Sequence, residues 1–84
     1  MKLAEIAVGE QYVMDGPSIS SGAGLSQYTV VRVIAVDPRG ARTRRVKVKV
    51  IDAPFHAKLR RGQTDSVLPS RLLYRRGDVI AARA

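Results

Sequence analysis

Ten cationic side chains are the residues whose type and spacing point most directly to chemistry with a partner. Guanidinium groups grip phosphate or carboxylate oxygens through paired hydrogen bonds, and lysine adds a mobile point charge. Four of the arginines fall near one turn, two lysines continue from them along a strand, and two Arg-Arg pairs follow in later turns. The ten residues are Arg39, Arg42, Arg44, Arg45, Lys47, Lys49, Arg60, Arg61, Arg75 and Arg76. This grouping predicts a surface that binds an anionic partner.

The run from Arg45 to Ile51 shows how one element would position such cations. Valines alternate in it with Arg45, Lys47 and Lys49, which is the two-residue period of a β-strand. One face of the strand is therefore apolar and the other cationic, and the like charges on that face repel one another. A bound polyanion would relieve the repulsion. The alternative is a solvated sheet face whose charges discourage edge-to-edge pairing of strands.

The charge balance of the whole chain narrows the classes of partner. The 84 residues include 15 lysines and arginines but only 7 carboxylates, for a net charge of +8. Such a balance indicates nucleic acid, an acidic protein surface or anionic lipid. A GC-rich genome would favour arginine over lysine, but it would not explain the shortage of acids. No stretch approaches the ~20 apolar residues of a membrane helix, and no signal-peptide-like segment begins the chain. We therefore expect a cytoplasmic protein with no membrane partner.

Catalytic and metal-binding groups are sparse. The chain has no cysteine, which excludes disulfides and thiolate metal sites, and its single histidine, His56, cannot build a zinc site alone. The carboxylates are scattered, and four of them, Asp15, Asp37, Asp52 and Asp78, flank expected turns, where aspartate satisfies local backbone donors. We expect no catalytic residues, no metal and no cofactor, and hence a protein that is not an enzyme.

One small, mainly β domain spanning residues 1–84 is the expected architecture. An apolar fraction of 45% rich in valine and poor in aromatics suits a pleated sheet. The turn-forming run Asp37-Pro38-Arg39-Gly40 predicts a β-hairpin over 28–51. A long irregular loop should occupy 15–26, with Ile19 and Leu25 attaching it to the core. Short helical or 3₁₀ turns are expected near 2–8 and 55–59, and a tight turn at 69–73 should bury Leu72 or Leu73. The expected strands cover 11–15, 28–36, 42–51, 65–68 and 79–81.

This order of elements resembles the SH3-like barrels, the group that includes Tudor and KOW modules. The resemblance is carried by residues 8–12 leading into the first strand, by the 28–51 hairpin, and by residues 67–71 before the last strand. It implies a small closed five-stranded barrel, with a five-stranded OB-fold barrel as the alternative. The paired aromatics of peptide-binding SH3 grooves and the aromatic cage of methyl-lysine readers are missing, so neither activity is expected.

The leading functional hypothesis is a module that contacts nucleic-acid phosphates through the 39–49 hairpin and the arginine pairs. Because aromatic residues are few, we expect contacts to the nucleic-acid backbone instead of base stacking. The alternative is an adaptor of bacterial or phage origin that docks on an acidic host protein, and the composition is compatible with an actinobacterial phage as its source. A third possibility is self-assembly through an exposed barrel edge. The two binding hypotheses depend on which cations share one face.

Overall fold

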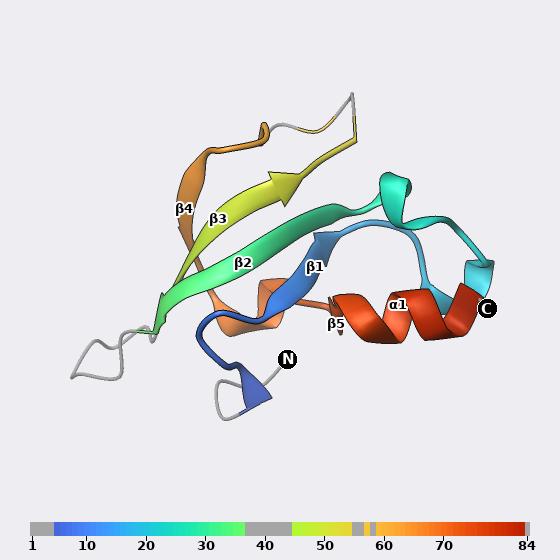
Figure 1. Cartoon of the computed structure of the whole chain (residues 1–84), viewed down its shortest axis with the longest axis horizontal. Helices are drawn as coiled ribbons and strands as arrows, with labels where there is room; N and C mark the ends of the chain where they lie inside the picture. The colour runs from blue at the N-terminus through green and yellow to red at the C-terminus, as the bar shows by residue number, and fades with distance from the viewer. Residues whose placement is uncertain (1–4, 37–44, 55–56, 58, 84) are drawn as a thin grey trace.

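The computed structural model describes residues 5–36, 45–54, 57 and 59–83. Five antiparallel strands form one sheet in the order β4-β3-β2-β1-β5 (Figure 1). The strands are β1 (Gln11–Asp15), β2 (Thr29–Val36), β3 (Val46–Asp52), β4 (Thr64–Val67) and β5 (Tyr74–Arg75). The helical elements are the 3₁₀ turns η2 (Ile19–Ser21), η3 (Leu25–Gln27) and η4 (Pro69–Arg71), and the helix α1 (Arg76–Arg83). The mainly β fold expected from the sequence is confirmed.

The β2–β3 hairpin is the centre of the sheet. Arg32 lies opposite Lys49 and Val33 lies opposite Val48, so at these positions a cation pairs with a cation and a valine pairs with a valine across the two strands. Because the side-chain period of a strand is two, this register places every second side chain of β3 on the same face. The hairpin predicted over 28–51 is confirmed in its strands. Its turn at 37–40 lies outside the described residues.

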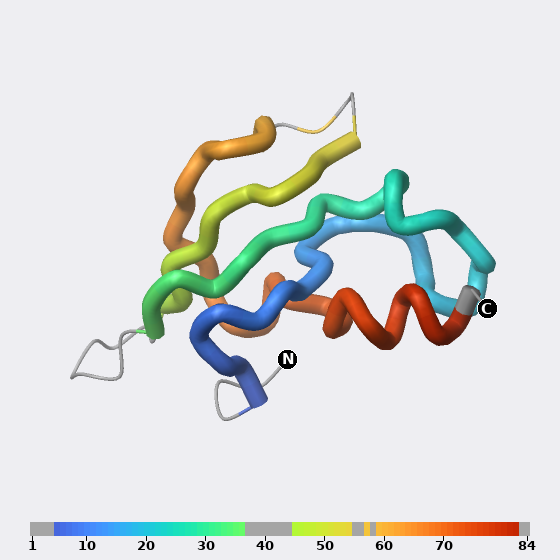
Figure 2. The backbone as a smooth tube through the Cα atoms, in the orientation of Figure 1, coloured from blue at the N-terminus to red at the C-terminus, as the bar shows by residue number. Residues whose placement is uncertain are grey.

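Two apolar clusters lie on opposite faces of the sheet. The first takes one face of all the longer strands and includes the three valines of β3, Val46, Val48 and Val50, each at most 1% exposed. The second joins Val13 and Val30 to Val79 of α1. Ile19 and Leu25 pack against that second cluster, as expected for the 15–26 loop. Figure 2 shows that α1, at the C-terminal end of the backbone trace, lies beside this loop.

The expected strand at 79–81 is wrong, because these residues belong to α1. Val79 is buried while Ile80 is exposed. A helix allows both, because the side that carries Val79 packs against the second cluster and the other side faces solvent. Two alanines follow, and alanine favours helix more than any other residue. The short β5 pairs with β1 only at Tyr74 and Arg75 before the chain turns into the helix.

The expected closure into a barrel is also wrong. The chain between β4 and β5 forms η4, and Leu72 behind it is fully buried while Leu73 is exposed. Within the described residues β4 pairs only with β3 and β5 only with β1, so the sheet is open along both edges. The sheet stays open because β5 is only two residues long. The residues that follow it form α1 and pack on the sheet, so they do not extend as a strand toward β4.

Gly16, which follows β1, offers a test of the loop packing. Its φ is +153°, and a Cβ added there would overlap the ring of buried Tyr28, with Cγ and Cε1 both 2.9 Å away. We expect Gly16→Ala to lower the free energy of unfolding by about 1–3 kcal/mol through overpacking, measured by urea denaturation. Gly22→Ala is the matched control, since its φ is also positive but open space surrounds it. Equal losses in the two variants would contradict the packing role.

Candidate nucleic-acid interface

A cationic row crosses the outward face of the sheet. Lys47 and Lys49 are exposed between buried valines on β3, and Arg32, directly opposite Lys49 on β2, is exposed as well. Residues that lie opposite each other on antiparallel strands project from the same face. Arg32, Lys47 and Lys49 therefore share one surface, which we call the cationic face.

Arg32 was not among the predicted site residues. It interrupts the otherwise largely apolar strand expected over 28–36, and the signal that identifies it is its place in the alternation of that strand. Val31 and Val33 beside it are both buried, so Arg32 must point outward. Its pairing with Lys49 then follows from the hairpin register, which depends on two irregularities in the β2–β3 ladder. Strand alternation locates the residue, but only the structure fixes its neighbour.

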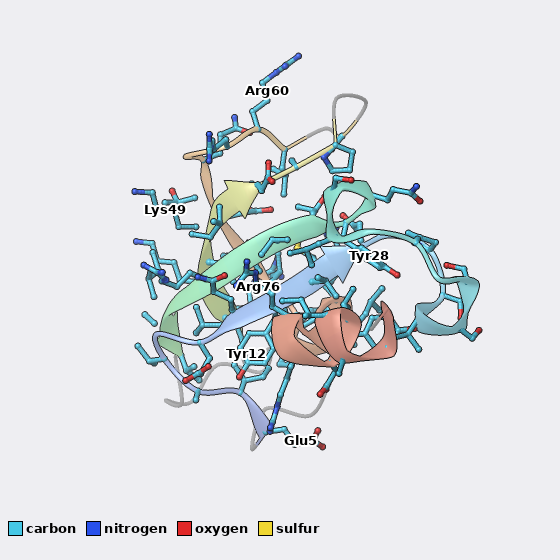
Figure 3. All side chains as sticks on the ribbon, turned by 45° about the vertical axis from the view of Figure 1, so that its right-hand side comes forward. Glu5, Tyr12, Tyr28, Lys49, Arg60 and Arg76 are labelled. Carbon is cyan, nitrogen blue, oxygen red and sulfur yellow. The ribbon has the colours of Figure 1, made fainter. Side chains whose placement is uncertain are left out.

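The cationic face continues toward the start of α1. Arg32 pairs with Gln11 on β1, and Gln11 lines a shallow hollow of about 400 Å³ together with Arg75 and Arg76. The β1–β5 register places Arg75 opposite Tyr12, and the next residue, Arg76, is the first residue of α1. Figure 3 shows Arg76 in front of β1, at the start of the helix. The row thus runs from β3 across the sheet to α1.

The three strand-borne cations have no partner within the part of the chain that the structure describes. No hydrogen bond or ion pair there engages the side chain of Arg32, Lys47 or Lys49. The one ion pair among the described residues joins Arg71 to Asp15 at 3.4 Å, with both side chains about half exposed. Solvated lysine and arginine heads of this kind are available to an external anion at little cost in broken contacts.

Arg45 has a different role from its neighbours. Its Nε donates to Ser66 Oγ at 3.2 Å and a terminal nitrogen donates to the Ser66 carbonyl at 2.8 Å. The Ser66 N–H in turn donates to Asp65 Oδ1 at 2.8 Å. Gly62 and Gln63 bond to Val50, so by alternation the backbone groups of Ser66 point away from β3, along the open edge of the sheet. Arg45 and Asp65 therefore cap that edge.

The remaining predicted cations do not join the row. Arg60 and Arg61 lie in the β3–β4 turn, where the Arg61 Nε donates to the carbonyl of Ile51 at 3.1 Å. Figure 3 shows Arg60 projecting there, apart from Lys49. Arg75 is exposed at the border of the hollow. The predicted residues Arg39, Arg42 and Arg44 lie outside the described residues.

Comparison of the chain with known protein families, with curated proteins and with solved structures gives no match. Of the helices in the described ranges, none is long and apolar enough to cross a bilayer. The described residues also contain no group of three or more histidine, aspartate or glutamate side chains placed to hold a metal ion. The cationic face is accordingly interpreted from its own geometry.

The edge cap formed by Arg45 gives a prediction about self-association. Arg45→Ala removes both hydrogen bonds to Ser66 and leaves a carbonyl unpaired on an edge strand, a template for pairing with another chain. We expect sedimentation velocity at 0.5 M salt to show a larger dimeric fraction for Arg45→Ala than for the wild type. Lys49→Ala removes one positive charge at a position of β3 that lies opposite Thr64 and forms no hydrogen bond to Ser66, and this variant should behave as the wild type. A dimer in both variants would assign the effect to charge, not to the edge.

Proposed function

We propose that this protein binds nucleic acid through phosphate contacts made by the cationic face, and that it is a binding module and not an enzyme. The observation that carries the proposal is the juxtaposition of Arg32, Lys47 and Lys49, all exposed, on one face and without partners in the described chain. Each is placed by a paired strand whose opposite face is buried, so the three positions are fixed before any ligand arrives.

The spacing of the three cations supports this assignment. Arg32 and Lys49 belong to a hydrogen-bonded antiparallel pair, whose Cα atoms lie ~5.5 Å apart. Lys47 and Lys49 are two residues apart on one strand, a separation of ~6.8 Å. A duplex carries one phosphate per ~1.7 Å of its axis, so several phosphates fall within reach of a patch of this size. Neutralising them releases condensed counterions, which drives the association.

The arrangement of elements supports a finer fold assignment. The order β4-β3-β2-β1-β5, with the 3₁₀ turn η4 inserted between β4 and β5, is the arrangement expected of an SH3-like module. We infer that the chain is an opened member of that architectural group. The departure is the C-terminal helix, which covers one face of the sheet where a barrel would continue.

An acidic protein surface is the second candidate ligand. Ile34 lies beside the irregularity in the β2–β3 ladder and is 39% exposed next to the cationic face, and Ile80 is 47% exposed at the hollow. A protein partner would use such apolar side chains together with the cations, whereas phosphate contacts do not need them. This observation favours an adaptor role over a solvated surface.

Removal of single charges tests the proposed phosphate contacts. Lys49→Gln is expected to weaken binding of a fluorescent 20-base-pair DNA duplex roughly tenfold at 0.1 M salt and to lower the slope of log K against log salt by ~0.9. Fluorescence anisotropy between 50 and 200 mM salt measures both quantities. Arg60→Gln is the control, because it removes one exposed charge outside the cationic face and should change neither quantity by more than about twofold.

Wild-type binding itself should fall by about 100-fold across that range of salt if four phosphates are neutralised. Binding that ignores salt, or equal effects of Lys49→Gln and Arg60→Gln, would overturn the proposal. Pull-down from a lysate separates the two candidate ligands. Partners lost on nuclease treatment support nucleic acid, whereas a nuclease-resistant partner that Lys49→Gln releases supports the acidic protein.

A further inference from the structure

We propose, resting on the function proposed above, that the ligand is double-stranded and that the cationic face contacts both of its phosphate rows at once. Lys47 and Lys49 contact one row, Arg76 contacts the other, and Arg32 lies over the groove between them. The shared chemistry is a pair of parallel phosphate rows, which duplex DNA and duplex RNA both supply.

Arg76 lies on the same face as the strand-borne cations. Tyr74 packs against the second cluster, on the side of the sheet where α1 lies, and the next residue, Arg75, is opposite Tyr12, which belongs to the first cluster. Arg76 follows as the first residue of α1, the helix that packs on this second-cluster side of the sheet through Val79. Gln11 is opposite Arg32 and lines the hollow together with Arg76. Lys49, Arg32 and Gln11 therefore form a row of cross-strand neighbours, and Arg76 lies at the end of this row in the hollow that it shares with Gln11.

The width of this row fits a duplex. From Lys49 on β3 to position 76 beside β1 the row crosses three strand spacings, and neighbouring strands lie ~4.8 Å apart, so the span is ~14 Å. The major groove of B-DNA is ~12 Å wide. Cations at the two ends of the row therefore reach phosphates on opposite strands of a duplex. A single strand occupies one end of the row and leaves the other unused.

The three tyrosines of the chain pack within the protein and do not lie on the cationic face. Tyr12 and Tyr28 are each 1% exposed, inside the two clusters. Tyr74 is half-buried against the second cluster, and its hydroxyl accepts from the Ile19 N–H at 3.4 Å. Single-strand binders gain ~1–3 kcal/mol for each base stacked on an aromatic ring. Among the described residues, the cationic face offers a ligand cations but no aromatic ring, and cations discriminate by phosphate density, which is highest in a duplex.

Two carboxylates moderate the Arg76 end of the row. Glu10 and Asp78 line the same hollow and are exposed, and neither forms an ion pair with Arg76 within the described chain. A phosphate entering the hollow meets their repulsion as well as the attraction of the arginine. Removing one carboxylate should therefore strengthen duplex binding without adding a contact.

The test compares variants on three 20-nucleotide probes of one sequence, by fluorescence anisotropy at 0.1 M salt. The probes are a DNA duplex, an RNA duplex and the single DNA strand. Arg76→Gln should weaken duplex binding roughly tenfold and single-strand binding less than twofold. Lys49→Gln should weaken both, Arg60→Gln neither, and Glu10→Gln should tighten duplex binding about two- to fivefold. Circular dichroism confirms that each variant folds.

The outcomes separate this inference from the function on which it rests. Preferential loss of duplex binding in Arg76→Gln supports contact with both rows, and the tighter of the two duplexes identifies the source. Tighter binding of the single strand, or equal losses on all probes in Arg76→Gln, overturns the inference while nucleic-acid binding stands. If no probe binds at all, the proposed function itself fails.

Discussion

The burial of three valines on one side of β3 is the constraint on which the rest of the structure depends. Val46, Val48 and Val50 fill the first apolar cluster, and their positions fix the pairing of β3 with both of its neighbours. A slip by one residue would turn Lys47 and Lys49 into that cluster and the valines to solvent. The cost of burying two unpaired ammonium groups excludes this register. The outward placement of the cations is thus a by-product of core packing, available for use in binding.

The face of the sheet that carries the cations also carries the second apolar cluster. Around Val13, Val30 and Ile51 it is apolar and covered by α1 and the 16–28 loop, whereas two residues away on β2 and β3, at Arg32 and Lys49, it is cationic and open. One helix of eight residues covers only part of a five-stranded sheet. The uncovered part must be polar to remain in water, and in this chain the polar residues there are mostly positive.

Local patterns predicted the strands well because each rests on short-range chemistry. The β2–β3 hairpin follows from valine alternation, and the Pro69 turn predicted that either Leu72 or Leu73 is buried, of which the structure buries Leu72. Residues 76–83 could not be assigned in this way, since their helix depends on Val79 meeting side chains from β1 and β2 that are more than 45 residues away. The role of Arg45 depends similarly on Ser66, 21 residues along the chain. Of the candidate site, sequence located Lys47, Lys49 and Arg76, but their alignment with Arg32 is a property of the strand order.

The placement of α1 has a consequence for how the chain folds as it is synthesised. The β2–β3 hairpin and β4 are complete by Val67, and the first cluster then lacks only Leu72 from later in the chain. The second cluster must wait for Val79, so Val13 and Val30 remain uncovered by the helix while the intervening residues emerge from the ribosome. Synthesis therefore passes through an interval in which this apolar face of the nascent sheet has only the 15–26 loop to cover it. Until Val79 has left the ribosome and packs on the sheet, this face stays accessible to chaperones and to aggregation.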